Sequence, residues 1–227
     1  MEWLLSVLLV LGMEVRPGPV GVALRRANER AHGLGILRGK TVLMFGDSMV
    51  NCGVNVWLEP WLKRQGVARF VTRSWASSTT LSWSIAPKLD TYIWQYDPDI
   101  VIVMLGSNEL FHPYPHMKVR PIRTLLGRLA PNRLVLWVGP PAWKPDKGII
   151  ATMKAQLPPG RFFDSGKVLM GRQKDGYHPS MAGSKTWAEA LQGWLTEVME
   201  SLPSKGRGAA AAPKQPRRGA QSQVGGQ

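Results

Sequence analysis

Three short motifs in the sequence carry the residue types that nucleophilic catalysis requires. Residues 45–49 (FGDSM) contain a serine, residues 106–109 (GSNE) contain an asparagine, and residues 175–179 (DGYHP) contain an aspartate and a histidine three positions apart. Each motif alone is a weak signal, because turns and helix caps with these residues are common in proteins without a catalytic role. Their order and their predicted positions in one fold favour a joint role.

The chemistry that these residues favour is attack by a serine hydroxyl on an ester carbonyl. A hydroxyl is a poor nucleophile until a base takes its proton, and His178 is the candidate base for Ser48. Asp175 is close enough in a turn to accept a hydrogen bond from the imidazole Nδ1, which leaves Nε2 facing the serine. The side-chain amide of Asn108 can donate to the negative charge that develops on the carbonyl oxygen.

The elements that must position these motifs alternate between strands and helices. Short apolar runs predict strands, and apolar residues at helical spacing predict the helices between them. The strands are predicted at residues 41–45, 69–72, 100–105, 133–138 and 161–163. Helices are predicted at residues 25–31, 54–65, 119–129 and 148–156, and a last helix runs to Val198 with Pro179 in its first turn. This α/β pattern predicts a three-layer, flavodoxin-like, doubly wound parallel sheet in the order 2-1-3-4-5. Reactive residues are expected at its switch point, past the carboxyl ends of strands one and three.

The combination of the three motifs resembles the SGNH (GDSL-like) hydrolase family over residues 41–198. The family carries the serine of a GDS block, a glycine, the asparagine of a GxND-like stretch, and the aspartate and histidine of a DxxH motif. The resemblance implies that Ser48 is the nucleophile, His178 the base and Asp175 the residue that orients the base. It implies an oxyanion hole with the Ser48 backbone and Asn108 as donors, and no cofactor.

The chain departs from the family pattern at two positions. The family usually places a glycine amide of the oxyanion hole in the loop after strand two, where this chain reads RSWASSTT over residues 73–80. Ser77 is the best match to that glycine, and its backbone N–H survives the substitution. Glu109 stands where the family often has an aspartate, beside an unaltered Asn108.

The implied function is hydrolysis of a carboxylic ester, carrying an acyl or acetyl group, through an acyl-enzyme on Ser48. The substrate is expected to be a small-molecule or carbohydrate ester. Three alternatives stay open: an O-acyltransferase that passes the acyl group to a sugar hydroxyl with the same triad, a non-catalytic carbohydrate- or polyanion-binding module, and a metal-dependent phosphoesterase. The last would use Asp47, Glu109 and His178.

Other candidate motifs are weaker. Residues 33–41 (GLGILRGKT) lack the glycine six positions before the lysine that a phosphate-binding loop needs, and they precede a strand instead of following it. His112 and His116 have a spacing that could share a helix face, but Pro113 and Pro115 break such a helix. The ten tryptophans are mostly expected in the core, whereas three in predicted loops are candidates to line a substrate groove: Trp75, Trp83 and Trp143.

The two ends differ from the folded part in composition. We predict an N-terminal segment over residues 1–38, a hydrolase domain over 39–202 and a basic disordered tail over 203–227. The apolar run at residues 3–13 is too short to span a bilayer and favours a cell-envelope or secreted location, with a cytoplasmic location as the alternative.

The net charge of +14 at pH 7 includes five positive charges in the tail, so about +9 belongs to the rest of the chain. Weak attraction to anionic surfaces is expected through the tail, but no specific nucleic-acid binding, since no base-stacking motif accompanies the charges. The lone Cys52 excludes an internal disulfide.

Overall fold

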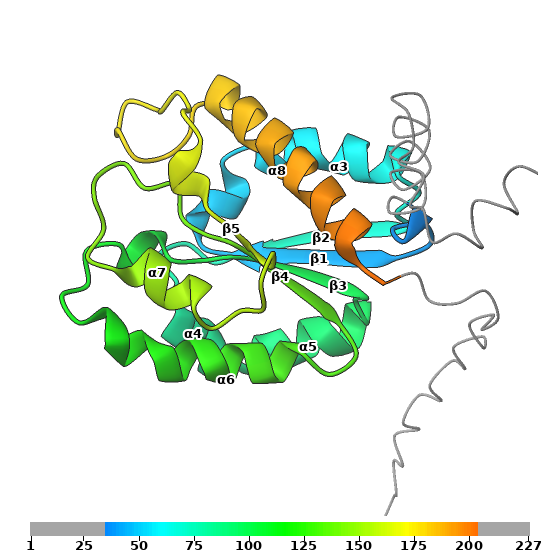
Figure 1. The fold of residues 1–227 in the computed structure, drawn as a ribbon, viewed down its shortest axis with the longest axis horizontal. Helices are drawn as coiled ribbons and strands as arrows, with labels where there is room; N and C mark the ends of the chain where they lie inside the picture. The colour runs from blue at the N-terminus through cyan, green and yellow to red at the C-terminus, as the bar shows by residue number, and fades with distance from the viewer. Residues whose placement is uncertain (1–34, 204–227) are drawn as a thin grey trace, which may run out of the picture.

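The computed structural model describes residues 35–203, which form a five-stranded parallel sheet with helices on both faces (Figure 1). The predicted helix at 25–31, the apolar run at 3–13 and nearly all of the basic tail lie outside the described residues. Within residues 35–203, no helix combines the length and the apolar character needed to cross a membrane.

The strand order confirms the predicted topology. The strands β1 (Thr41–Gly46), β2 (Arg69–Ser74), β3 (Ile100–Met104), β4 (Leu134–Val138) and β5 (Phe162–Phe163) lie in the order β2-β1-β3-β4-β5, and every neighbouring pair is parallel. All carboxyl ends therefore lie at the same edge of the sheet, and β1 has β2 and β3 as its direct neighbours there.

Helices form a layer on each side of this sheet (Figure 1). One side carries α3 (Val54–Arg64) and α8 (Met181–Ser201); the other carries α4 (Thr80–Ile85), α5 (Pro87–Tyr96), α6 (Val119–Leu129) and α7 (Ile149–Lys154). Successive strand residues point to opposite faces, so Val42 and Met44 join the core under α3 and α8. Leu43 and Phe45 join the core on the other side.

The helices α4 and α5 were not predicted from the sequence. The first begins at a capping box and the second carries a proline in its first turn. The Arg128 guanidinium on α6 also donates to the carbonyl oxygens of Trp83, Ser84 and Ala86, where α4 ends and α5 begins. The prediction that Trp83 lies in a loop is wrong. It lies in α4 with 1% of its surface exposed, and its indole donates to the Ser78 hydroxyl.

The start of α8 also differs slightly from the prediction. Ser180 is the N-cap, and its hydroxyl accepts a hydrogen bond from the Gly183 N–H, so Pro179 precedes the helix instead of occupying its first turn. A serine cap supplies an acceptor for an N–H that has no partner inside the helix.

Two glycines allow the ends of β1 and β3 to carry the first two motifs side by side. A β-carbon at Gly46 would stand 1.8 Å from the Met104 carbonyl oxygen, so only glycine fits at the end of β1. Gly106 has a φ of 125°, a conformation that residues with a β-carbon rarely adopt, and turns the chain sharply after β3. The backbone thus fixes the relative positions of residues 47–48 and 107–109.

Candidate active site

The predicted nucleophile lies directly after β1. Ser48 is the first residue of a short 3-10 helix, η1 (Ser48–Asn51), and it is half-buried. Asp47 is the cap of this helix, because its Oδ1 accepts the Met49 N–H at 3.0 Å. The strand, the glycine and the cap together hold the serine at the edge where the predicted switch point lies.

The structure brings Ser48, His178 and Asp175 together. The Ser48 Oγ lies 2.9 Å from His178 Nε2, and His178 Nδ1 lies 2.7 Å from Asp175 Oδ2. The other carboxylate oxygen of Asp175 accepts the N–H groups of Tyr177 and His178, each at 3.0 Å. The carboxylate is therefore fixed by the turn that it shares with the histidine, and the imidazole can accept a proton from the serine through Nε2.

The electrostatics favour an ionised Asp175. Desolvation acts to raise the pKa of this carboxyl, but the hydrogen bond from the His178 ring, the two backbone N–H groups and the attraction to His178 together lower it below its ordinary value. An ionised partner at Nδ1 is what stabilises an imidazolium after proton transfer.

Arg172 supports the segment that carries the aspartate and the histidine. Its guanidinium donates to the Tyr177 carbonyl oxygen at 2.7 Å and to the Pro141 and Ala142 carbonyl oxygens at 3.0 and 3.2 Å. It thereby joins residues 171–179 to the segment after β4. Sequence reasoning missed this residue, because nothing in the local pattern around Arg172 indicates a long-range contact.

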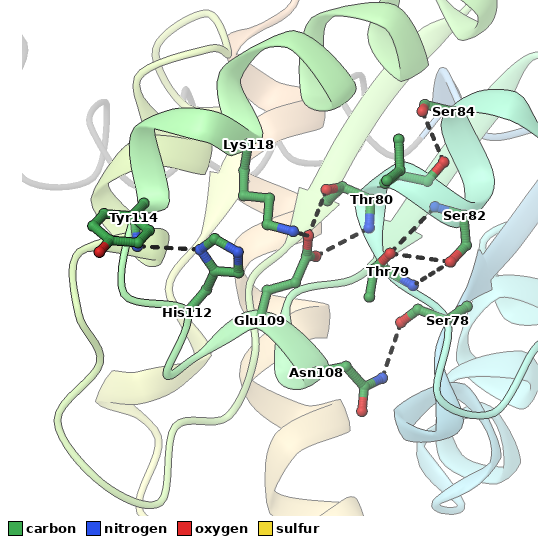
Figure 2. A network of polar contacts seen from close by, with 11 residues as sticks. Ser78, Thr79, Thr80, Ser82, Ser84, Asn108, Glu109, His112, Tyr114 and Lys118 are labelled. Atoms are coloured by element: carbon green, nitrogen blue, oxygen red, sulfur yellow. Dashed lines mark hydrogen bonds and ion pairs between the residues drawn. The ribbon is translucent and has the colours of Figure 1, made fainter.

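The predicted oxyanion donor Asn108 lies in η2 (Ser107–Glu109), directly after β3, and it is exposed. Its Nδ2 donates to the Ser78 carbonyl oxygen at 2.9 Å (Figure 2). An amide NH₂ group has two hydrogens, so this contact uses only one of them. The second is available for a substrate oxygen.

Ser77 lies next to this contact and has a backbone conformation that glycine favours. Its φ is 58°, in the left-handed region, and the residue is exposed. A glycine would adopt this conformation without strain, as expected at the position that Ser77 matches in the family pattern.

An aromatic row borders the histidine. We use this name for Phe111, Trp143, Tyr177 and His178, whose neighbouring ring centroids lie 5.5, 5.6 and 4.4 Å apart in that order. Phe111 and Tyr177 are 41% and 40% exposed, so the row offers an apolar surface beside the base. Trp143 was predicted as a groove residue, whereas Phe111 and Tyr177 were missed although each lies near a motif.

Of the other predicted groove residues, Trp75 packs against Trp83 with ring centroids 5.6 Å apart. The Lys88 ammonium lies 3.2 Å from the Trp75 ring centroid, so one face of this indole is already occupied. Trp75 thus packs against α4 and Lys88 at the start of the loop after β2, and the structure does not place it in the aromatic row.

The described residues give no geometric support to a metal site. Both carboxylate oxygens of Glu109 face Thr80, and within residues 35–203 no three His, Cys, Asp or Glu side chains are grouped to hold a metal ion. His116 lies in the short helix η3 (Pro115–Lys118), while the His112 Nδ1 accepts the Tyr114 N–H at 3.2 Å. The phosphoesterase alternative therefore lacks its ligand set here.

Cys52 is not a competing nucleophile. Burial, with smaller contributions from the negative charges of Asp47 and Asp175, raises the pKa of its thiol to about 11. A thiol with this pKa stays protonated at neutral pH, and the thiolate is the reactive form.

Comparison with known proteins gives structural neighbours only. A scan against protein-family models and a search of curated proteins found no match. Among solved structures, TesA aligns with a TM-score of 0.59 and 22% sequence identity, covering 70% of this chain and 99% of TesA. A family 3 carbohydrate esterase from Clostridium thermocellum aligns with a TM-score of 0.58 and 16% identity, covering 70% of this chain and 96% of its own.

A psychrotrophic esterase, EstA from Pseudoalteromonas sp., aligns with a TM-score of 0.56 and 16% identity, covering 70% of this chain and 98% of its own. These likenesses and the strand order confirm the predicted fold, a doubly wound parallel sheet of five strands in the order 2-1-3-4-5. At such low identities they show the arrangement of the chain and leave its activity to be argued from the site.

The buried carboxyl of Asp47 generates a prediction about stability. Burial raises its pKa from 3.8 to about 6, although the Met49 and Ser107 groups beside it act to lower the pKa. The folded state therefore binds the proton more tightly than the unfolded state. The stability that this group contributes is fully present below pH 3.8 and is lost as the pH rises through about 6.

We expect Asp47→Asn to raise the free energy of unfolding at about pH 7.5 by roughly 1–3 kcal/mol, since each unit of pKa shift is about 1.4 kcal/mol. Asparagine is neutral at every pH and keeps an oxygen for the Met49 N–H. The gain should shrink toward about pH 4.5, and urea unfolding of both proteins at the two pH values measures it. A gain of equal size at both pH values would contradict the assignment.

Proposed function

We propose that this protein hydrolyses carboxylic esters through an acyl-enzyme on Ser48. The observation that carries the proposal is the continuous hydrogen-bonded chain from the Ser48 Oγ through His178 to Asp175, located at the carboxyl edge of the parallel sheet. A nucleophile, a base within reach and a third group that orients the base form the arrangement that activates a serine.

In the first half of the reaction, the Ser48 Oγ attacks the ester carbonyl carbon and its proton passes to His178 Nε2. The tetrahedral intermediate collapses, the bond to the alcohol oxygen breaks, and the alcohol leaves with the proton from His178. In the second half a water molecule gives a proton to His178 and attacks the acyl-enzyme. The acid leaves and Ser48 regains its proton.

The negative charge on the carbonyl oxygen would be met by three donors: the backbone N–H of Ser48, the backbone N–H of Ser77 and the free Nδ2 hydrogen of Asn108. Their segments follow β1, β2 and β3, the three strands that lie side by side in the sheet. Donors fixed before the reaction stabilise the charge without reorganising, which is why such sites lower the barrier.

The substrate that we favour is an acylated carbohydrate. The aromatic row provides flat apolar surface next to the base, and such rings pack against the apolar faces of sugars as well as against other apolar groups. The structural neighbours include a carbohydrate esterase, a carbohydrate acetylesterase family member and a two-domain esterase active on acetylated mannans.

For the triad, we expect Ser48→Ala and His178→Ala each to abolish hydrolysis of p-nitrophenyl acetate, because members of a triad act as a unit. Asp175→Asn should cost heavily too, because the amide can favour the wrong tautomer of the imidazole. Rates, circular dichroism spectra and labelling by a fluorophosphonate probe are measured together on each variant.

Ser201→Ala is the matched control, since Ser201 lies at the end of α8 and its hydroxyl donates to the Val198 carbonyl oxygen. It should keep the parent rate and the label. A folded Ser48→Ala variant with more than a few per cent of the parent rate would sink the proposal, as would loss of activity on addition of a chelator.

For the oxyanion hole, we expect Asn108→Ala to lower kcat by roughly a hundredfold or more with little change in KM, because a donor to the developing charge is removed. Ser77→Gly should keep most of the activity, since glycine retains the N–H and adopts the left-handed conformation without strain. Ser77→Ala should also remain active. A large loss in Ser77→Ala would instead assign a role to its hydroxyl.

For the aromatic row, we expect Trp143→Ala to raise the KM for an acetylated xylo-oligosaccharide about tenfold, while the KM for the small substrate methyl acetate changes less than twofold. Trp94→Ala is the control, because this tryptophan is 71% exposed but lies on α5. A rise in KM that is seen only with p-nitrophenyl octanoate would show that the aromatic row binds acyl chains. The carbohydrate assignment would then be wrong.

A further inference from the structure

The loop over residues 75–80 carries Ser77 and is held at both of its ends. At its start, the Trp75 N–H donates to the Gly46 carbonyl oxygen at 2.9 Å, and the neighbouring Ser74 hydroxyl donates to the Asp47 carbonyl oxygen at 3.0 Å. These two bonds tie the loop to the segment that carries Ser48.

At its other end the loop is held by two consecutive residues of η2 (Figure 2). Asn108 donates to the Ser78 carbonyl oxygen, as described above. Glu109 accepts the Thr80 N–H on Oε2 at 3.0 Å and the Thr80 hydroxyl on Oε1 at 2.7 Å. One side chain thus takes both polar hydrogens of Thr80, the first residue of α4.

Glu109 carries a carboxylate, yet only 2% of its side-chain surface is exposed. A buried carboxylate is costly unless charged or hydrogen-bonding groups surround it. Lys118, 14% exposed, supplies a positive charge 3.6 Å from Oε1, and the two donors of Thr80 supply the hydrogen bonds. Every group that offsets the burial of Glu109 therefore belongs to the loop after β2 or to the segment after η2.

We propose that Glu109 is a positioning residue whose carboxylate locks residues 75–80 against η2, so that the Ser77 N–H and the Asn108 amide meet the same substrate oxygen. This role rests on the proposed ester hydrolysis. Ser77 lies between the anchor at Trp75 and the anchors at Ser78 and Thr80, so the direction of its N–H depends on both ends. Loss of the Glu109 anchor leaves the triad intact and misplaces one oxyanion donor.

The test compares Glu109→Gln with Thr80→Val in the full chain. Glutamine has one acceptor oxygen and no charge, so it cannot accept both Thr80 donors and pair with Lys118. Valine at position 80 removes only the hydroxyl donor and keeps the N–H. We expect kcat on p-nitrophenyl acetate to fall tenfold or more in Glu109→Gln and several-fold in Thr80→Val, with KM within about threefold of the parent value.

The double variant gives a sharper measurement. Since both substitutions break the same attachment, the double variant should be no more than about twofold slower than Glu109→Gln alone. Losses that multiply in full would show that the two residues act independently, and the proposal would be overturned.

Asp99→Asn is the matched control. Asp99 accepts the Thr41 N–H at 2.9 Å and the Lys40 ammonium at 3.1 Å, so it too pairs a backbone donor with a lysine, but it precedes β3, at the other edge of the sheet. The kcat of the Asp99→Asn variant should stay within twofold of the parent value. An equal loss of kcat in Asp99→Asn would show that removing any such carboxylate slows the enzyme. Glu109 would then have no specific role.

Amide hydrogen exchange separates this proposal from the proposed reaction. Exchange in residues 75–80 should become at least tenfold faster in Glu109→Gln and stay unchanged in Asp99→Asn. Unchanged exchange in Glu109→Gln, or a kcat within twofold of the parent value, overturns the positioning role. If the parent neither hydrolyses esters nor reacts with a fluorophosphonate, the reaction assignment fails, and the exchange result still decides whether Glu109 holds the loop.

Discussion

The close approach of β1 to β3 at Gly46 is the constraint on which the site depends. Because a β-carbon at this position would stand 1.8 Å from the Met104 carbonyl oxygen, the two strand ends can meet only at a glycine. The Asp47 N–H then donates to that same carbonyl oxygen at 3.1 Å, and the Gly46 carbonyl oxygen accepts from Trp75. One point of backbone contact thereby sets the relative positions of the serine, the loop after β2 and the turn after β3.

The cost of this arrangement is the burial of two carboxyl groups behind the serine. Asp47 has none of its surface exposed and Glu109 has 2%, and the charge of Glu109 contributes to the raised pKa of Asp47. Within residues 35–203, Asp47 Oδ1 accepts the Met49 N–H and its Oδ2 has no hydrogen-bond partner, whereas both carboxylate oxygens of Glu109 accept from Thr80. Here one carboxyl caps the helix that begins at Ser48, and the other holds the loop that carries Ser77.

The sequence contains most of the sheet and the Asp175–His178 pair in local form, which is why these could be predicted, whereas the contact of Ser48 with His178 spans 130 positions. Strands β1, β3, β4 and β5 are apolar runs, whereas β2 (RFVTRS) mixes apolar and polar residues. His178 and Asp175 share one turn, so their pairing follows from their spacing. The helices α4 and α5 were missed although a capping box from Thr79 to Ser82 and Pro87 mark their starts. No local pattern, however, indicates that Arg128, more than 40 positions away, holds the junction between them. The same limit applies to Arg172 and to Thr80, whose importance arises from partners that only the fold brings near.

The supports of the site fall into two groups that share no side chain. Arg172 joins the segment of Asp175 and His178 to the end of β4, whereas Glu109 and Asn108 join the loop of Ser77 to the end of β3. Ser48 lies between the two groups and contacts the first through the His178 ring. The two groups are nevertheless linked at Ser48, because the Ser74 hydroxyl donates to the Asp47 carbonyl oxygen and ties the Ser77 loop to the segment that carries the serine. In the proposed reaction this segment would therefore set the nucleophile and one oxyanion donor together.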